Sequence, residues 1–267
     1  MTNDNTLALI NRYRSPIMGF AALWIVFFHL WQPLFADGAP AALFYAENVI
    51  KRLGFEGVDM FFLLSGMGLT YSIGKHSLGG FYLRRLRRLA IPFVAVAALR
   101  AVCERWGWRA FLFVVSGANF FVGNMYFFLW FVTAIAVLYL VFPLYWRFFS
   151  RARSKPAFTL AVIAVWYVLS LALKGTLRED MYGFTNRIPV FVTGVLLGWR
   201  AQNGVRLPSR RAVAVAAVLA LAGLILSFLC NFRGLELSLP QSNCCLPDYL
   251  TALGLTALLA ELFALLD

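Results

Sequence analysis

His29 stands out because it is an imidazole within an apolar stretch, Ile17 to Phe35. A polar side chain at membrane depth is costly, and such a residue is by default a functional candidate. Imidazole has an ordinary pKa of about 6.5, so it can accept a proton from a hydroxyl group near neutral pH. The alternative is a neutral histidine that hydrogen-bonds a carbonyl group and packs between helices. The sequence therefore offers His29 as a candidate general base.

Two carboxyl groups follow in the stretch GFEGVDMFFLLSG, at Glu56 and Asp59. They are three residues apart, which is close to one helical turn, so they lie on one face of a helix. One of them could hold the tautomer of a histidine base, as a third group does in hydrolytic triads. The alternative is that they only suit the positive end of a helix dipole. The small residues Ser65, Gly66 and Gly68 favour close packing of a neighbouring helix.

Four arginines in five positions come next, in FYLRRLRRLAIPF: Arg84, Arg85, Arg87 and Arg88. Guanidinium groups bind phosphate oxygens through paired hydrogen bonds, so this run is a candidate phosphate site. The alternative is a loop that fixes the membrane topology and meets anionic headgroups.

These residues belong to a chain with the composition of a membrane protein. It is 61% hydrophobic and 13% charged, whereas soluble domains contain about 25% charged residues. Apolar stretches near the roughly 20 residues of a membrane span recur at Ser15–Phe35, Gly57–Ile73, Leu89–Cys103, Met125–Tyr145, Ala157–Leu173, Ile188–Trp199, Ala212–Cys230 and Tyr249–Leu266. We therefore expect an all-α fold, a polytopic transmembrane helix bundle of about eight spans in one domain over residues 1–267. The first helix should have Ser15 as its N-cap and Pro16 at its first position.

The charges set the expected orientation. The net charge is +12, yet the basic residues gather in alternate short loops, which predicts a membrane topology and not nucleic-acid binding. The N-terminus and the arginine run then lie in the cytoplasm, and most acids, such as Glu47 and Asp248, lie outside. The run Ala110–Gly123 should be an interfacial or re-entrant segment, because a full span there would invert the loops that follow. The four cysteines form no CxxC pair, so we expect no disulfide framework and no metal site.

The order of these stretches resembles the acyltransferase-3 family of integral-membrane O-acyltransferases. The resemblance runs from about Arg12 to Gly198 and rests on the deep histidine, GVDMFFLLSG, the arginine run, MYFFLWFVTAIAVLYLVFPLY and NRIPVFVTGVLLG. It implies a multi-pass protein of the cell (inner) membrane. It also implies transfer of acyl groups, often acetyl from acetyl-CoA, to hydroxyls of surface polysaccharides or small exported molecules.

The resemblance assigns roles to residues of this chain. His29 corresponds to the first-helix histidine of the family, and Arg84–Arg88 corresponds to its basic inner loop. Trp130, Asn186 and Arg187 fall in two of the matching stretches and are expected to bind substrate. Acyl-CoA would dock on the arginines from the cytoplasm. His29 would be the base on the acceptor hydroxyl, directly or through an acyl-histidine, with Asp59 or Glu56 as its partner.

Two features depart from the family pattern. The usual arginine eleven residues before the histidine is Met18, although Arg14 lies one turn further inward. Ten spans are usual, so C-terminal helices could be missing. The alternatives to acyl transfer are a transporter or exporter in which His29 lines a path, and a catalytically inactive relative.

Overall fold

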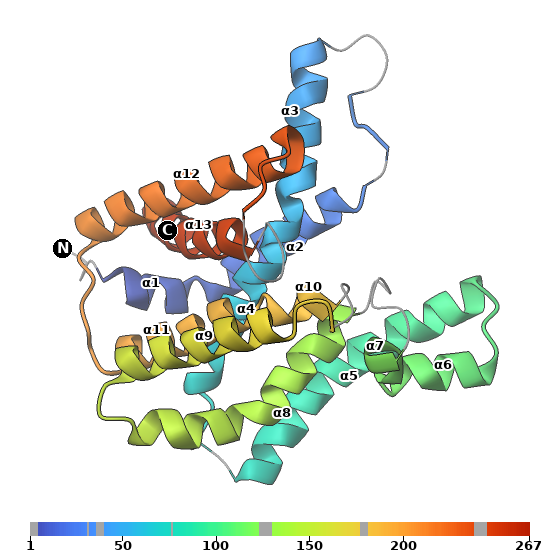
Figure 1. Cartoon of the computed structure of the whole chain (residues 1–267), viewed down its shortest axis with the longest axis horizontal. Coiled ribbons are helices and arrows are strands. Elements are labelled where there is room, and N and C mark those ends of the chain that lie inside the picture. Colours follow the sequence, from blue (N-terminus) through green and yellow to red (C-terminus); the bar gives the residue numbers. More distant parts are fainter. Residues whose placement is uncertain are drawn as a thin grey trace. The chain divides into compact units, whose positions relative to one another are not determined.

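The computed structural model describes residues 5–30, 32–35, 40–75, 77–122, 130–176, 181–237 and 245–267. Within these ranges the secondary structure is helical and no β-strand occurs, which confirms the all-α prediction (Figure 1). The chain divides into two compact units, which we describe separately. Unit 1 contains Met1–Tyr71, Thr159–Lys174 and Asn186–Asp267, and unit 2 contains Ser72–Phe158 and Gly175–Thr185. The single domain expected over residues 1–267 stays a prediction.

Unit 1 has one helix, α4 (Gly57–Thr70), at its core. Every residue of α4 except Phe61 is buried, as expected for a helix that is apolar on all its faces. The other elements of this unit are α1 (Thr6–Arg12), α2 (Arg14–Phe28), α3 (Ala41–Arg52), the 3₁₀ turn η1 (Leu53–Glu56), α11 (Ile188–Gln202), α12 (Ser209–Arg233) and α13 (Cys245–Leu266), with most of α9 (Lys155–Ala172).

Glycines let α11 lie directly on α4. A Cβ atom added to Gly194 would lie 2.1 Å from the carbonyl oxygen of Leu63. One added to Gly66 would lie 2.2 Å from the carbonyl oxygen of Phe191. No side chain fits at either position, so the two backbones are in contact. The close packing predicted for Gly66 is confirmed.

The first apolar helix is shorter than the sequence predicts. α2 begins at Arg14, so the predicted N-cap at Ser15 is wrong. Because α1 leads almost directly into α2, the chain is already helical before it reaches Ser15. The helix ends at Phe28, and His29 is its C-cap. His29 therefore lies at the end of the helix and not within it.

Unit 2 consists of α5 (Leu78–Cys103), α6 (Trp108–Val115), α7 (Ala118–Val122), α8 (Trp130–Arg151), α10 (Tyr182–Thr185) and the first residues of α9. The arginine run lies within α5, so its prediction as a loop is wrong. The hydroxyl of Ser77 caps this helix by accepting a hydrogen bond from the N–H of Gly80 at 3.2 Å. Arginine is also a good helix former, so the helix begins well before the apolar stretch.

The described part of Ala110–Gly123 contains two short helices and no full span, in agreement with the prediction. After α5 the chain reverses near Arg105, which has a φ of 55°. α6 then packs on the second half of α5, where Val114 belongs to one apolar cluster with Phe93 and Ala97. The interfacial or re-entrant placement of this hairpin stays a prediction.

Among the described residues, four helices are long and apolar enough to cross a membrane: α8, α9, α12 and α13. α2, α4 and α11 have 15, 14 and 15 residues, fewer than the roughly 20 of a vertical span. The chain is therefore a helical protein suited to a bilayer. The count of eight spans stays a prediction.

Candidate functional site

His29 lies at the exposed C-terminal end of α2. Its backbone N–H donates to the carbonyl oxygens of Ile25 at 3.2 Å and Val26 at 3.0 Å. Its imidazole meets the ring of Phe28 edge to face, with 5.0 Å between the ring centroids. The backbone of His29 is thus fixed, while its side chain is open to a substrate.

The end of α2 is held by the GFEGVD motif through two glycines. A Cβ atom added to Gly54 would lie 2.5 Å from the carbonyl oxygen of Trp24, and one added to Gly57 would lie 2.7 Å from that of Ala21. η1 and the start of α4 therefore lie directly against the C-terminal half of α2. The motif positions His29 through backbone packing.

A hollow of about 280 Å³ lies beside the end of α2. The chain neighbours of His29, Phe28 and Leu30, form part of its wall, and the other lining residues are Pro33, Phe44, Glu47, Asn48, Lys51 and Arg52. We define these eight residues as the α3 hollow. Its wall combines apolar rings with polar groups, a composition that suits a ligand bearing hydroxyl groups.

The non-helical segment that follows α2 is tied to α3 by a largely buried ion pair. The carboxylate of Glu47 accepts hydrogen bonds from the N–H groups of Leu34 at 2.7 Å and Phe35 at 2.9 Å. Lys51 pairs with Glu47 at 2.5 Å and donates to the carbonyl oxygen of Gln32 at 2.7 Å. The hydrogen bond from Lys51, with those from the two amides, lowers the pKa of Glu47 from 4.5 to about 2.

Three charged side chains, from α4, α13 and the N-cap of α11, meet inside unit 1. Nη2 of Arg187, at the start of α11, lies 3.1 Å from Oδ2 of Asp59 and 3.5 Å from Oδ2 of Asp248. The three residues are 8%, 1% and 2% exposed, respectively. A buried charge is costly unless it is paired, so we expect this buried charge cluster to hold the three helices together. In the described residues, no group of three or more His, Cys, Asp or Glu is arranged to hold a metal ion.

Glu56 is fully buried beside this cluster, and its carboxyl group faces Ser227 of α12 and Thr251 of α13. Among the described residues, neither carboxyl oxygen has a hydrogen-bond partner of normal geometry, nor has the Thr251 hydroxyl. Unpaired buried polar groups are uncommon and cost stability. The role of Glu56 in catalysis stays a prediction.

The two acids do not contact His29 as its expected partners. Within the described ranges, no hydrogen bond or ion pair joins His29 to Glu56 or Asp59. Both acids are buried, whereas His29 is exposed. Their role in orienting the imidazole stays a prediction.

Arg14, which could compensate for Met18, lies at the opposite end of α2 from His29. A Cβ atom added to Gly68 would lie 2.3 Å from Nη1 of Arg14, so the guanidinium group packs on α4 near its C-terminal end. Fifteen residues of α2 separate Arg14 from His29 by about 22 Å. Arg14 therefore does not extend its side chain to His29.

Arg85, the second arginine of the run in α5, is half-buried in unit 2. Its Nη2 donates to the hydroxyl of Ser72 at 2.5 Å. Its guanidinium group lies over the rings of Phe81 and Tyr139, at 5.7 Å and 5.6 Å from their centroids. These contacts hold the Arg85 side chain in one place.

The other three arginines of the run, Arg84, Arg87 and Arg88, have exposed side chains. At 100° per residue they lie within an arc of about 100° on α5, and Arg85 lies outside that arc. Exposed guanidinium groups on one side of a helix can bind several oxygens of one polyphosphate. These three residues keep the arrangement that the expected phosphate site needs.

The residues expected to bind substrate lie in different units. Trp130 is half-buried at the start of α8 in unit 2. Asn186 and Arg187 precede α11 in unit 1, and both are buried. Arg187 belongs to the buried charge cluster, a role that the sequence did not predict. Substrate binding by all three stays a prediction.

Sequence reasoning placed Asp248 on the outer side and did not include it in a site. A signal for it was present, because Asp248 is an acid in the first turn of an apolar helix, as Asp59 is. Asn48 and Lys51 of the α3 hollow carried no comparable signal. They lie on a short polar-faced helix, where such residues are ordinary.

Apolar helices of membrane length define a membrane protein, and an exposed histidine next to the α3 hollow gives it a candidate site for proton transfer. The chain matches the family described as "Acyltransferase domain" over residues 19–264, nearly its whole length. It therefore belongs to the acyltransferase-3 family, as the resemblance predicted. No curated protein and no solved structure matches the chain.

Proposed function

We propose that this protein is a membrane O-acyltransferase that moves an acyl group from acyl-CoA to a hydroxyl of a surface polysaccharide or another carbohydrate. The acyl group that we propose is acetyl. Membership of the acyltransferase-3 family supports acyl transfer. The observation that carries the assignment to this site is the exposed imidazole of His29 at a fixed helix end beside the α3 hollow.

His29 acts as the general base in the proposed reaction. Its imidazole takes the proton of the acceptor hydroxyl while the hydroxyl oxygen attacks the thioester carbonyl carbon. The carbon–sulfur bond then breaks, and the departing CoA thiolate takes up the proton. Positioned proton transfer of this kind contributes about 10²–10⁴-fold to a rate.

The α3 hollow holds the acceptor in this account. Asn48 is exposed on its wall, and its side-chain amide can donate hydrogen bonds to hydroxyl groups and accept hydrogen bonds from them. Phe28 and Phe44 offer apolar faces to a sugar ring. Because Phe28 directly precedes His29, a carbohydrate in the hollow lies next to the end of α2 that bears the base.

The donor binds through its phosphates. Arg84, Arg87 and Arg88 present three exposed guanidinium groups that suit the several phosphate groups of CoA. The expected topology places them in the cytoplasm, where acyl-CoA is available, and keeps the N-terminus on the same side. Arg85 contributes less to this site, because Ser72 and two aromatic rings hold its side chain.

The buried charge cluster positions the site through helix packing. Arg187 holds Asp59 at the first turn of α4, next to Gly57, which packs on α2. The cluster therefore fixes the helix against which the end of α2 is placed. Asp59 contributes to the site through this packing.

The test is acetyl-CoA consumption by the purified protein in lipid nanodiscs, followed as released CoA thiol with a panel of sugars and glycans. Acyl transfer predicts thiol release that depends on one acceptor class. Asn48→Ala should raise the KM for that acceptor, whereas Asn203→Ala, at an exposed asparagine outside the hollow, should not. Solute flux without thiol release would instead identify a transporter, and neither activity would identify an inactive relative.

A further inference from the structure

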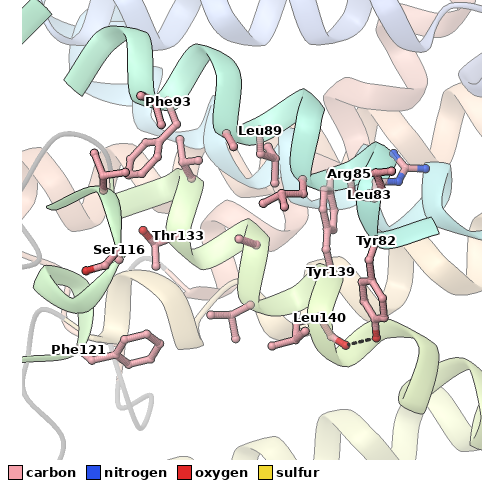
Figure 2. A pocket seen from close by; sticks show the side chains of 18 residues that line it. Tyr82, Leu83, Arg85, Leu89, Phe93, Ser116, Phe121, Thr133, Tyr139 and Leu140 are labelled. Atoms are coloured by element: carbon pink, nitrogen blue, oxygen red, sulfur yellow. Dashed lines mark hydrogen bonds between the residues drawn. The ribbon is translucent and has the colours of Figure 1, made fainter. Parts of the chain in front are cut away.

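Unit 2 contains a groove of about 650 Å³ along α5, bounded by α8 and by the turn between α6 and α7 (Figure 2). Its walls are almost wholly apolar, and include Leu86, Leu89, Phe93, Val132, Val137 and Leu140. Figure 2 shows Arg85, Tyr82 and Tyr139 at one end and Phe93, Ser116 and Phe121 at the other. The groove thus has a basic, aromatic end and an apolar end.

We propose that this groove binds one hydrocarbon chain of an anionic phospholipid, with the lipid phosphate at the Arg85 end. The proposal is independent of acyl transfer. Eight residues of α5 separate Arg85 from Phe93, which is about 12 Å of helix. One leaflet of a hydrocarbon core about 30 Å thick is about 15 Å deep. The groove therefore has the length of one leaflet, beginning at a charged end.

The groove is open to the side. Leu83, Leu86 and Leu140 on its wall are 47%, 62% and 65% exposed. In a bilayer, an open apolar channel next to a helix is in contact with lipid chains. A chain lying in it is covered on several sides by unit 2, which an ordinary boundary lipid is not.

Arg85 supplies the charge that selects an anionic headgroup. Ser72, Phe81 and Tyr139 hold its guanidinium group at the end of the groove. A guanidinium group has five N–H donors, so it can bind a phosphate oxygen while it donates to Ser72. Basic pockets between membrane helices on the cytoplasmic side are typical sites for anionic lipid headgroups.

The acyl-CoA donor is a less suitable occupant. The groove-lining residues Leu86, Leu89 and Phe93 lie on the face of α5 opposite to Arg84, Arg87 and Arg88, by their spacing at 100° per residue. A donor with its phosphates on those three arginines would have to pass around the helix to place a chain in the groove. A membrane lipid reaches the groove directly.

The test measures binding of phosphatidylglycerol and of neutral phosphatidylcholine to the full chain in mild detergent, by native mass spectrometry. Leu86→Trp fills the groove, and Ile91→Trp is its control, because Ile91 is 68% exposed on α5 but does not line the groove. Arg85→Gln removes the charge, with Arg147→Gln, at an exposed arginine of α8 that does not line the groove, as its control. We expect the first change of each pair to weaken phosphatidylglycerol binding about tenfold, and its control to leave binding within about twofold.

Three results would overturn the proposal. One is equal binding of the two lipids, and another is equal affinity of Leu86→Trp and Ile91→Trp. The third is displacement of phosphatidylglycerol from the Leu86-dependent site by long-chain acyl-CoA, which would make the donor chain the occupant. If Leu86→Trp does not fold, Ala136→Phe on α8 blocks the same groove and is subject to the same comparison.

Discussion

Nη2 of Arg187 lies 3.1 Å from Oδ2 of Asp59, so a buried ion pair joins the start of α11 to the first turn of α4. Asp248 of α13 lies 3.5 Å from the same nitrogen. One guanidinium group therefore faces two carboxyl groups from different helices. The start of α4 also packs on α2, so the pair stabilises the region of unit 1 that positions His29.

Loss of Arg187 should destabilise the protein strongly. Arg187→Gln leaves Asp59 and Asp248 buried without their cation, which should cost about 3–5 kcal/mol of unfolding free energy. Adding Asp59→Asn should restore part of this loss, because one uncompensated charge is removed. The measurement is chemical or thermal unfolding in detergent, with the exposed Arg84→Gln as the control. Equal stability of Arg187→Gln and Arg84→Gln would show that the cluster holds no helices together.

The contact between α4 and α11 should not tolerate one added methyl group. Gly194→Ala places a Cβ atom where the carbonyl oxygen of Leu63 lies, so the helices must separate, at a cost of at least about 1–3 kcal/mol. Gly19→Ala on α2 is the matched control, because nothing lies within 4 Å of its added Cβ atom. The control should be neutral or more stable by about 0.4–1 kcal/mol. A Gly194→Ala protein as stable as Gly19→Ala would refute the backbone contact.

The segment after α2 should detach from α3 in acid. The pKa of Glu47 is about 2 in the folded protein and 4.5 ordinarily, so its carboxylate stabilises the fold fully above about pH 4.5. That contribution is lost as the pH falls from 4.5 toward 2. The measurement is hydrogen exchange of the Leu34 and Phe35 amides, corrected for intrinsic rates, which should lose protection over this range. Glu47→Gln should show reduced protection already at neutral pH, and full protection in that variant would contradict the assignment.

The sequence predicted the helices well and the ends of some of them poorly. Apolar runs of membrane length became helices because such segments satisfy their own backbone hydrogen bonds. The first run seemed to continue to Phe35, because hydropathy does not show that Glu47 binds the amides of Leu34 and Phe35. The arginine run resembled a loop that fixes the membrane topology. Ser77 precedes the run, however, and serine is a residue type that can cap the start of a helix containing these arginines.

The candidate site was only partly readable from the sequence. His29 was identified from its polarity in an apolar stretch, which is a local signal. The pairing of Arg187 with Asp59 and Asp248 was not identified. It joins residues far apart in the chain and depends on how α4, α11 and α13 pack. The α3 hollow was missed for the same reason, since its wall forms only when α3 meets the end of α2.

The expected topology can be tested with single cysteines in a cysteine-free background. Ser77, Ser154 and Asn203 have exposed side chains in segments expected to face the cytoplasm, and Ala42 lies exposed on α3, expected outside. A membrane-impermeant maleimide should label Ala42→Cys in intact cells and the other three only after the membrane is opened. Ser242, which lies outside the described residues, should label as Ala42 does. Labelling of Ser154→Cys in intact cells would overturn the charge-based orientation.

The most direct test of acyl transfer at this site compares thiol release from acetyl-CoA by the unmodified protein and by His29→Gln, at saturating donor and acceptor. We expect the rate of His29→Gln to fall about 10²–10⁴-fold, the contribution of general acid–base catalysis. Its thermal unfolding should be unchanged, because the His29 side chain is exposed. His76→Gln, at the other histidine of the chain and outside the described residues, should keep the original rate. A folded His29→Gln protein that releases CoA at the original rate would contradict the role of His29 as the base.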